Sequence, residues 1–361
     1  MKIVFSGGGT MGSVSPLLAM AEHLLSQENM IPSDFVWIGT KSGPEGAVVR
    51  RQDIEFHAIC SGKLRRYFSW KNFTDPFHII VGFVQAHKIL RRFKPDVVIS
   101  AGSFVAVPVV YAAKTLGIKV LVHQLDIQVG LANSLAARVA DTVTVSWADL
   151  LEKFPGHKPI WTGTPVRKYI IEPVSHSLND DLHMDKSRSQ LLFMGGGTGA
   201  AGLNRLVIDA LPKLLKKYGV THLTGANRSI KPQLSESEKR WYVQYDFAYE
   251  DFGHILQRSD LVICRAGLGT ISELMAIGKP SILIPMPETH QEANAEFFAR
   301  QGAAEQLDQI GLTADQLVAK IDELMEDDEL RIDIAERAAA LARRDANAAI
   351  VHEIIKLCQN D

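Results

Sequence analysis

Two glycine-rich loops carry the first chemical signal in the sequence. Gly7-Gly8-Gly9-Thr10 and Gly195-Gly196-Gly197-Thr198 each follow a short apolar run and precede a helical pattern. Such a loop lets backbone N–H groups approach a ligand, and the N-terminus of the next helix favours an anion. We therefore expect a phosphate-bearing ligand, although a tight strand-to-helix turn would need the same residues. Neither loop has the GxGxxG or the Walker pattern, so a dinucleotide or P-loop site fits poorly.

A denser group of polar residues lies in the second half of the chain. Cys264–Glu273 runs from a predicted strand into a predicted helix and contains two further glycines. Glu273 could accept two vicinal sugar hydroxyls, or it could serve only as a carboxylate favoured in a first helical turn. The hydroxyls of Thr270 and Ser272 could cap that helix. After the next predicted strand come side chains that suit a sugar, at the place where open α/β sheets bind ligands: His290, Gln291 and Asn294.

Short apolar runs alternate with helical patterns along most of the chain, which is the βαβ signature of doubly wound parallel sheets. A polar stretch, 175–189, separates two such series, so we expect two Rossmann-like domains with a cleft between them. Helical patterns include Pro16–Leu25, Phe77–Phe93 and the tail Thr313–Asp361. The predicted strands are Ile3–Ser6, Phe35–Gly39, Ile54–Ile59, Val97–Ala101, Val120–His123, Thr142–Ser146, Gln190–Met194, Leu261–Cys264 and Ser281–Pro285.

Length and composition agree with two folded domains. The chain has 361 residues, of which 46% are hydrophobic and 22% charged, which excludes a disordered chain, a collagen-like repeat and a disulfide scaffold. Its three cysteines show no CxxC spacing, so a reducing compartment and no zinc site are expected. We find no signal peptide and no apolar run long enough to span a membrane, and we expect a cytoplasmic protein unless something recruits it to a membrane.

The near-neutral net charge of -2 is unevenly distributed. Residues 1–163 carry 17 Lys and Arg against 12 Asp and Glu, so the first half is basic and the remainder acidic. Cations mix with aromatic and apolar residues within 63–94, a composition suited to the interface of an anionic bilayer. A core helix after a solvated loop is the plain alternative, and no nucleic-acid motif accompanies the charge. The candidate membrane residues are Arg65, Arg66, Phe68, Trp70 and Phe73.

Several short motifs, in this order and spacing, resemble the MurG family of glycosyltransferases, glycosyltransferase family 28, over nearly the whole chain. They include Gly8-Gly9-Thr10, Lys94–Val98, Gly163–Arg167, Gly195–Ala200 with Asn204, Cys264–Glu273, and Gln291 with Asn294. The resemblance implies a GT-B fold of α/β class. Residues 1–163 would form an acceptor-binding, membrane-facing domain and 164–340 a UDP-sugar domain, with 341–361 a helix able to pack back on the first.

The resemblance also implies the reaction. Family members move N-acetylglucosamine from UDP-GlcNAc to lipid I, with inversion and without a bound metal or other cofactor. The implied partners are a UDP-sugar, a polyprenyl-diphosphate-linked acceptor and an anionic membrane, without nucleic acid, at the cytoplasmic face of the plasma membrane.

Roles for the donor side follow from the matched positions. Glu273 would hold the ribose hydroxyls, Tyr249 would stack on uracil, and Arg167 would contact phosphate. The other residues implied on the donor side are Thr10, Gly12, Gly196, Gly197, Thr198, Gly199, Leu268, Gly269, Thr270, His290 and Gln291.

The chain departs from the family in three loops of the first domain. Where the family has Gly-Gly-Thr-Gly-Gly-His, this chain has Gly8–Ser13, so Ser13 replaces a histidine that is often proposed as catalytic. The family's His-Glu-Gln-Asn becomes His123-Gln124-Leu125-Asp126, and its Gly-Gly-Tyr becomes Gly102-Ser103-Phe104. The donor-side motifs are better kept.

Two interpretations of these departures stay open. Asp126 could replace the missing base that deprotonates the acceptor hydroxyl, because a carboxylate in a closed cleft can have a raised pKa. Ser13 could not act as a base without help. Alternatively, Asp126 only caps a helix, and the chain is a paralogue with another lipid or glycan acceptor or a weakly active nucleotide-sugar-binding subunit.

Overall fold

The computed structural model describes residues 1–62, 71–172, 187–196, 199–226, 228–248 and 251–359. The chain divides into two compact units. Unit 1 contains Met1–Arg167 together with Arg343–Asp361, and unit 2 contains Lys168–Ala342. The sequence predicts boundaries after residues 163 and 340. The roles assigned to the two domains, and the cleft between them, stay predictions.

Unit 1 is built on a seven-stranded parallel sheet with the order β3-β2-β1-β4-β5-β6-β7. The chain starts in the middle of this sheet, so the order reverses between β1 and β4. Loops at such a switch point flank the crevice in which doubly wound sheets bind ligands. The strands are β1 (Ile3–Ser6), β2 (Phe35–Gly39), β3 (Glu55–Ala58), β4 (Val97–Ser100), β5 (Lys119–Gln124), β6 (Thr142–Val145) and β7 (Ile160–Trp161).

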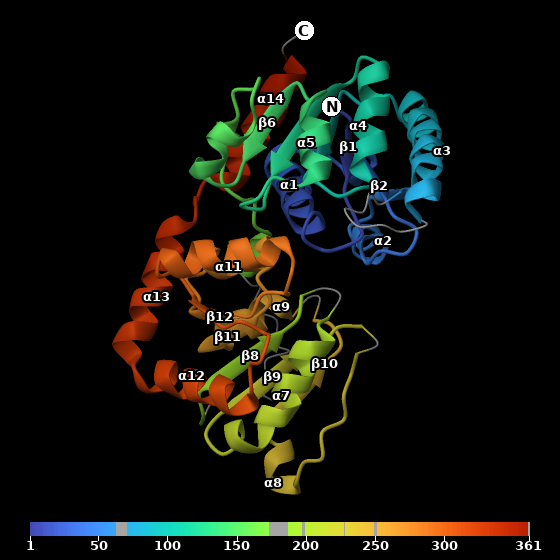
Figure 1. Cartoon of the computed structure of the whole chain (residues 1–361). Coiled ribbons are helices and arrows are strands. Elements are labelled where there is room, and N and C mark those ends of the chain that lie inside the picture. Colours follow the sequence, from blue (N-terminus) through green and yellow to red (C-terminus); the bar gives the residue numbers. More distant parts are fainter. Residues whose placement is uncertain (63–70, 173–186, 197–198, 227, 249–250, 360–361) are drawn as a thin grey trace. The chain divides into compact units, whose positions relative to one another are not determined.

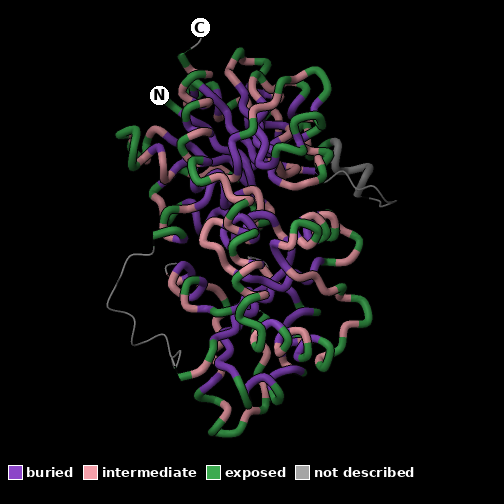
Figure 2. The backbone as a smooth tube through the Cα atoms, turned by 90° about the vertical axis from the view of Figure 1, so that its left-hand side faces the viewer, coloured by how far each residue is buried: buried purple, intermediate pink, exposed green. Residues whose placement is uncertain are grey.

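Helices cover the sheet of unit 1, and Figure 2 shows its interior as buried. The strands β1, β2 and β4 are buried throughout, whereas the edge strands β3 and β7 are partly exposed. Apolar side chains of α3 and α4 pack on Val4, Val98 and Val122 of the sheet. The last helix, α14, returns from unit 2 and packs against α1 (Figure 1). The helices are α1 (Val14–Gln27), α2 (Glu45–Arg50), α3 (Lys71–Phe93), α4 (Ala106–Thr115), α5 (Leu131–Ala137) and α14 (Ala346–Gln359), with the 3-10 turns η1 (Pro32–Asp34) and η2 (Ala148–Lys153).

Unit 2 repeats this design with a six-stranded parallel sheet of order β10-β9-β8-β11-β12-β13. Its switch point lies between β8 and β11. The strands are β8 (Gln190–Met194), β9 (Gly219–Leu223), β10 (Tyr242–Tyr245), β11 (Leu261–Cys264), β12 (Ser281–Leu283) and β13 (Glu305–Gln306). The helices are α6 (Lys168–Ile171), α7 (Ala201–Leu214), α8 (Glu236–Lys239), α9 (Phe252–Arg258), α10 (Leu268–Ala276), α11 (His290–Arg300), α12 (Ala314–Glu326) and α13 (Asp328–Leu341).

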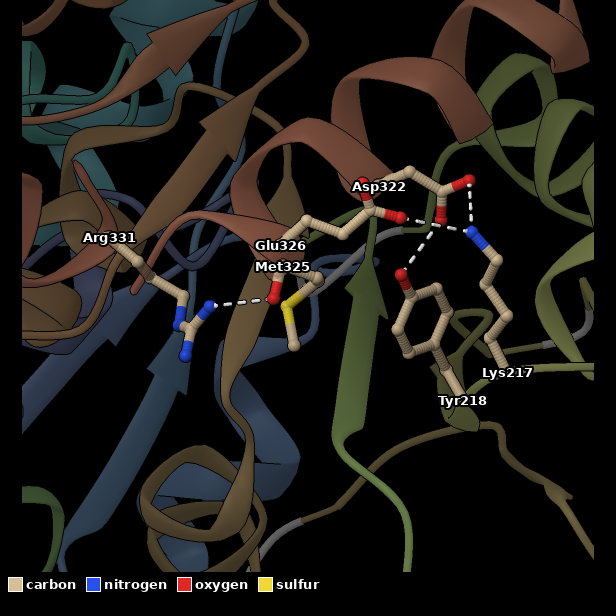
Figure 3. A network of polar contacts seen from close by, with 6 residues as sticks. All are labelled: Lys217, Tyr218, Asp322, Met325, Glu326 and Arg331. Carbon is tan, nitrogen blue, oxygen red and sulfur yellow. Dashed lines mark hydrogen bonds and ion pairs between the residues drawn. The ribbon is translucent and has the colours of Figure 1, made fainter. Parts of the chain in front are cut away.

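A polar network ties the end of α7 to α12 on the surface of unit 2 (Figure 3). The Tyr218 hydroxyl donates to Asp322 at 2.7 Å, and the Lys217 ammonium lies 2.9 Å from Asp322 and 3.3 Å from Glu326. Burial, and then the hydrogen bond to Asp322, raise the pKa of Tyr218. Nearby, Arg331 donates to the carbonyls of Leu324 and Met325 at the end of α12. These contacts hold α12 in place on unit 2 and do not involve the glycine loops that follow the strands.

The fold class predicted from the sequence is confirmed, since each unit is a doubly wound parallel α/β sheet. All nine predicted strands exist, within two residues of the predicted ends. β7, β9, β10 and β13 were not predicted. No helix within the described ranges is both long and apolar enough to cross a bilayer.

Candidate active site

The first glycine loop, after β1, is held by a buried carboxylate that no local sequence motif indicates. Glu45 is fully buried and accepts hydrogen bonds from the N–H of Gly9 at 3.1 Å and from the N–H and hydroxyl of Thr40 at 2.6 and 2.5 Å. A Cβ at Gly8 would lie 2.2 Å from Glu45 Oε1. At Gly8, glycine is therefore needed for the approach of Glu45.

The loop after β4 contacts this glycine loop directly. Ser103, with a positive φ of 87°, donates its hydroxyl to the carbonyl of Gly8 at 2.7 Å. Gly9 has a positive φ of 82°. A Cβ at Gly9 would lie 3.1 Å from the ring of Phe104. The predicted acceptor-side residues Gly102, Ser103 and Phe104 thus belong to one loop that packs on the other.

The remaining residues predicted in the first loop occupy different surroundings. Thr10 is exposed and Gly12 is half-buried. Ser13 precedes α1, and its Oγ is buried without a hydrogen bond to any residue that the structure describes. No base within the described residues is therefore hydrogen-bonded to Ser13.

The histidine at the end of β5 is not available as a base. His123 is fully buried, with Nδ1 3.0 Å from the Thr144 hydroxyl and Nε2 2.9 Å from the Ser146 hydroxyl. Burial lowers the pKa of His123 to about 3. The ring stays neutral at physiological pH, and both of its nitrogens serve the packing of β5 on β6.

Asp126 lies on the loop between β5 and α5 and is half-buried. It does not cap the following helix, because the N-cap of α5 is Gly130. The capping interpretation of Asp126 is therefore wrong for α5. Asp126 therefore places a half-buried carboxylate on the loop that follows β5.

In unit 2 the loop after β8 packs closely on the loop after β9. Gly196 and Gly199 have φ angles of 81° and 69°. A Cβ at Gly199 would lie 2.3 Å from the carbonyl oxygen of Thr224, so only glycine allows the two backbones to come this close. Asn204, fully buried on α7, donates to the same carbonyl at 2.9 Å.

A buried histidine supports Asn204. His222 Nε2 lies 3.3 Å from Asn204 Oδ1, and Nδ1 lies 3.0 Å from the hydroxyl of Tyr242. Burial lowers the pKa of His222 to about 4, so the ring is neutral. His222 was not selected from the sequence, because its partners are distant along the chain.

The N-terminus of α10 opens beside the end of β11. Its N-cap is Gly267, so Thr270 and Ser272 lie inside the helix and the idea that they cap it is wrong. A helix leaves its first N–H groups, here those of Leu268, Gly269 and Thr270, without partners in the helix, which suits a diphosphate. A Cβ at Gly267 would meet nothing within 4 Å.

Glu273 is buried, with 5% of its surface exposed. As the sixth residue of α10 it lies in the second turn and not, as the sequence suggested, in the first. Stabilisation of the helix dipole falls off beyond the first turn, so that reason for a carboxylate at this position is weak.

The start of α11 is fastened to the end of β11. Asn294, fully buried on α11, donates to the carbonyl of Ala266 at 3.0 Å. Gln291 Oε1 accepts from the N–H of Met286 at 3.0 Å. Arg265 is also buried and donates to the carbonyls of Ile284 and Pro285, directly after β12. The half-buried Gln291 and the exposed His290 therefore lie on the same edge of the sheet as α10.

Several predicted residues fall outside this description. The structure does not describe Arg65, Arg66, Phe68, Trp70, Gly197, Thr198 or Tyr249. Phe73 belongs to α3, and its side chain lies outside the described part of the structure. Arg167, half-buried, is the last residue of unit 1 before the chain enters unit 2. Among the described residues no three His, Cys, Asp or Glu side chains gather as a metal site.

Comparison with known proteins gives the family. The glycosyltransferase family 28 N-terminal domain matches residues 3–145, and the family 28 C-terminal domain matches residues 190–351. A Bacillus cereus protein, named UDP-N-acetylglucosamine–N-acetylmuramyl-(pentapeptide) pyrophosphoryl-undecaprenol N-acetylglucosamine transferase 2, is 38% identical over 91% of this chain and 93% of its own length. A Clostridium kluyveri protein has the same name without the number. It is 36% identical over 98% of this chain and 99% of its own length.

Solved structures agree. MurG of Acinetobacter baumannii matches with a TM-score of 0.71 at 26% identity, over 98% of this chain and 99% of that chain. The UDP-GlcNAc 2-epimerase of Neisseria meningitidis, bound to UDP-GlcNAc, matches with a TM-score of 0.69 at 15% identity, over 99% of this chain and 100% of that chain. At this low identity the similarity shows the fold alone. With both of its domain models matched in order and relatives aligned over nearly its full length, the chain belongs to glycosyltransferase family 28.

Proposed function

We propose that this protein transfers N-acetylglucosamine from UDP-GlcNAc to the N-acetylmuramyl-pentapeptide carried on undecaprenyl diphosphate, forming lipid II. The observation that carries the proposal is similarity over nearly the full length to relatives named for this reaction. The N-terminal and C-terminal domain models of the family both match, in this order, which supports the same two-domain enzyme.

Unit 2 supports a role as the donor domain. Three features lie at the carboxyl edge of its sheet: Gly195 and Gly196 directly after β8, the N-terminus of α10 and the start of α11. In the proposed complex the diphosphate lies at the N–H groups of Leu268–Thr270, and the buried carboxylate of Glu273 accepts the ribose hydroxyls. Because the chain as a whole is acidic after residue 163, phosphate binding depends on these local dipoles.

Unit 1 supports a role as the acceptor domain with Asp126 as the base. His123 is neutral and fully engaged, and Ser13 has no hydrogen-bonded base within the described residues. In the proposed reaction Asp126 removes the proton from the acceptor hydroxyl as this oxygen attacks the anomeric carbon. The UDP leaving group departs on the opposite face, which inverts the anomeric configuration.

Helix α3 supports docking on the cytoplasmic face of an anionic membrane. Phe77, Ile80 and Val84 are 67%, 61% and 46% exposed, although each is apolar. Helical spacing places them on one face with the exposed cations Lys88 and Arg91. This mixture of apolar and basic side chains suits the interfacial zone of a bilayer that carries anionic lipids. Figure 1 shows α3 on the outer side of α4, in unit 1.

The test is a transfer assay with radiolabelled UDP-GlcNAc and a lipid I analogue. We expect labelled lipid II and free UDP from the parent protein, and a loss of about a hundredfold or more in kcat for Asp126→Asn. Near-parental activity of that variant would remove Asp126 as the base.

One observation keeps a second function in view. Ser13 stands where the family has a histidine, and that position belongs to the first glycine loop. If UDP-GlcNAc binds and no transfer to the lipid I analogue occurs, the protein is a nucleotide-sugar-binding subunit. If transfer occurs only to another lipid or glycan, it is a paralogue with a different acceptor.

A further inference from the structure

The loop that carries Asp126 is held by a buried amide side chain. Gln124, with only 1% of its surface exposed, is the last residue of β5. Its Nε2 donates to the backbone carbonyls of Asp126 at 2.6 Å and of Gln128 at 3.2 Å. One side chain thus fixes two carbonyls of the turn that leads from β5 toward α5.

A second amide completes this arrangement. Asn133, on α5 and 5% exposed, donates from Nδ2 to Gln124 Oε1 at 2.7 Å and to the His123 carbonyl at 3.1 Å. If the amide oxygen and nitrogen of Gln124 were exchanged, the oxygen would face the carbonyls of Asp126 and Gln128, and the nitrogen would face the donating Nδ2 of Asn133. The contacts therefore determine the orientation of the amide. The Leu125 carbonyl is fixed separately by the Trp147 indole at 2.9 Å.

This geometry requires a neutral donor at position 124. An ionised carboxylate only accepts hydrogen bonds, so a glutamate there would place its oxygens against the carbonyls of Asp126 and Gln128. Leaving such groups buried and unpaired is costly. The family's motif has glutamate at this position and asparagine two residues later, whereas this chain has Gln124 and Asp126.

We propose that Gln124 is a positioning residue, which with Asn133 sets the backbone of the Asp126–Gln128 turn and so the place of the Asp126 carboxylate. The neutral Gln124–Asn133 pair gives a reason why position 124 is not a carboxylate in this chain. The proposal rests on the proposed role of Asp126 as the base.

The test uses Gln124→Glu in the full chain, with two measurements. Hydrogen exchange of the amides in 125–130, expressed as protection relative to the parent protein at the same pH, reports the turn directly. The kcat for transfer to the lipid I analogue, measured from pH 5.5 to 8.5, reports the carboxylate. Two titratable groups belong to this stretch: Asp126 itself, and His123, which stays neutral over the whole range.

We expect the variant to lose protection and about tenfold or more in kcat at pH 8, where the introduced carboxylate would be ionised. Both quantities, expressed relative to the parent protein at the same pH, should recover as the pH falls, because a protonated carboxyl can donate one of the two bonds. The KM for UDP-GlcNAc should stay within about twofold, since the donor site is assigned to unit 2. Gln128→Glu adds the same charge on an exposed side chain of the turn, and should keep the parental pH profile.

Three results would overturn the proposal. They are parental protection in Gln124→Glu, a kcat profile with the parental shape despite lost protection, or the same altered profile in Gln128→Glu. A purely structural role would lower the melting temperature without changing the pH profile. If the parent protein transfers no GlcNAc, the proposed function fails, and the exchange measurement still decides whether Gln124 holds the turn.

Discussion

The side chain of Asn347 pairs with both backbone polar groups of Val166. Its Oδ1 accepts from the Val166 N–H at 2.9 Å, and its Nδ2 donates to the Val166 carbonyl at 2.8 Å. The two residues are 181 positions apart, and the contact joins the first turn of α14 to the segment that ends in Arg167. A Cβ on Gly163 would lie 2.6 Å from the Cβ of Arg343, so the same segment also packs tightly on the chain before α14.

Removing this pairing should weaken unit 1. We expect Asn347→Ala to lower the free energy of unfolding by about 1–3 kcal/mol, because two backbone groups lose their partner. Asn347→Asp keeps an acceptor and loses the donor, so its effect should also be destabilising. Urea denaturation at neutral pH measures the change, with Gln359→Ala, at the exposed end of the same helix, as the control. Equal midpoints for Asn347→Ala and this control would refute the assignment.

Glu45 should be needed as a carboxylate and not merely as a polar side chain. Three donors converge on its two oxygens, so in Glu45→Gln an NH2 group would face at least one donor. We expect a loss of about 1–3 kcal/mol in unfolding free energy. Transfer activity should also fall, because the first glycine loop loses its support. Glu28→Gln, an exposed change at the end of α1, is the matched control and should leave stability near the parental value.

Stability should fall as the solution is acidified from pH 7.5 to 5, in part through His222. Its pKa is lowered to about 4 in the folded protein, against 6.5 when unperturbed. The unfolded chain therefore binds more protons between these values, so stability present above about pH 6.5 is lost as the pH falls toward 4. The contribution at pH 5 is about 2 kcal/mol.

His222→Gln should remove that part of the pH dependence. The comparison is the difference in unfolding free energy between pH 7.5 and 5, for this variant and for His352→Gln, whose exposed side chain lies on α14. The pKa of His123 is also lowered, and His123 remains in both variants, so part of the pH dependence of stability should persist. An unchanged difference in His222→Gln would contradict the prediction.

The exposed face of α3 should decide binding to vesicles. We expect Ile80→Asp and Val84→Asp to reduce co-sedimentation with phosphatidylglycerol vesicles by about tenfold, since each removes apolar contact and adds a repulsive charge. Ile332→Asp is the matched control, because Ile332 is 57% exposed in unit 2 and Ile80 is 61% exposed in unit 1. Binding that is equally strong for all variants would show that α3 does not face the membrane.

Much of the fold could be predicted because parallel strands buried on both faces are nearly continuous apolar runs, as in Val97–Ser100 and Leu261–Cys264. β9 was missed for a physical reason. It carries the buried polar residues Thr221 and His222. The partners of His222, Tyr242 and Asn204, come from other elements, so a local hydrophobicity pattern does not register the strand.

The candidate site could be predicted as a set of loops but not as a set of contacts. Glycine-rich motifs identified the loops after β1, β8 and β11, because their signal is local, whereas the loop after β4 was identified only through the family resemblance. The residues that fix the loops could not be predicted in this way, because they act through specific hydrogen bonds. Glu45 binds the loop after β1 from 36 positions away, and Gln124 holds the turn after β5 together with Asn133, nine positions further along the chain. The position of Glu273 in the second turn of α10 followed only once Gly267 was seen to be the N-cap.

The bond from Ser103 to Gly8 has a consequence for how this loop can change in evolution. A non-glycine residue at a φ of 87° costs about 1–2 kcal/mol in backbone strain, and a hydrogen bond to a carbonyl returns about 1 kcal/mol. The family's glycine at this position avoids both effects. The two residues are therefore nearly interchangeable in a melting experiment, yet serine adds a hydrogen bond between the β4 loop and the β1 loop that glycine cannot make. Selection for stability alone would therefore tolerate either glycine or serine at position 103, whereas selection on acceptor binding would distinguish the two residues.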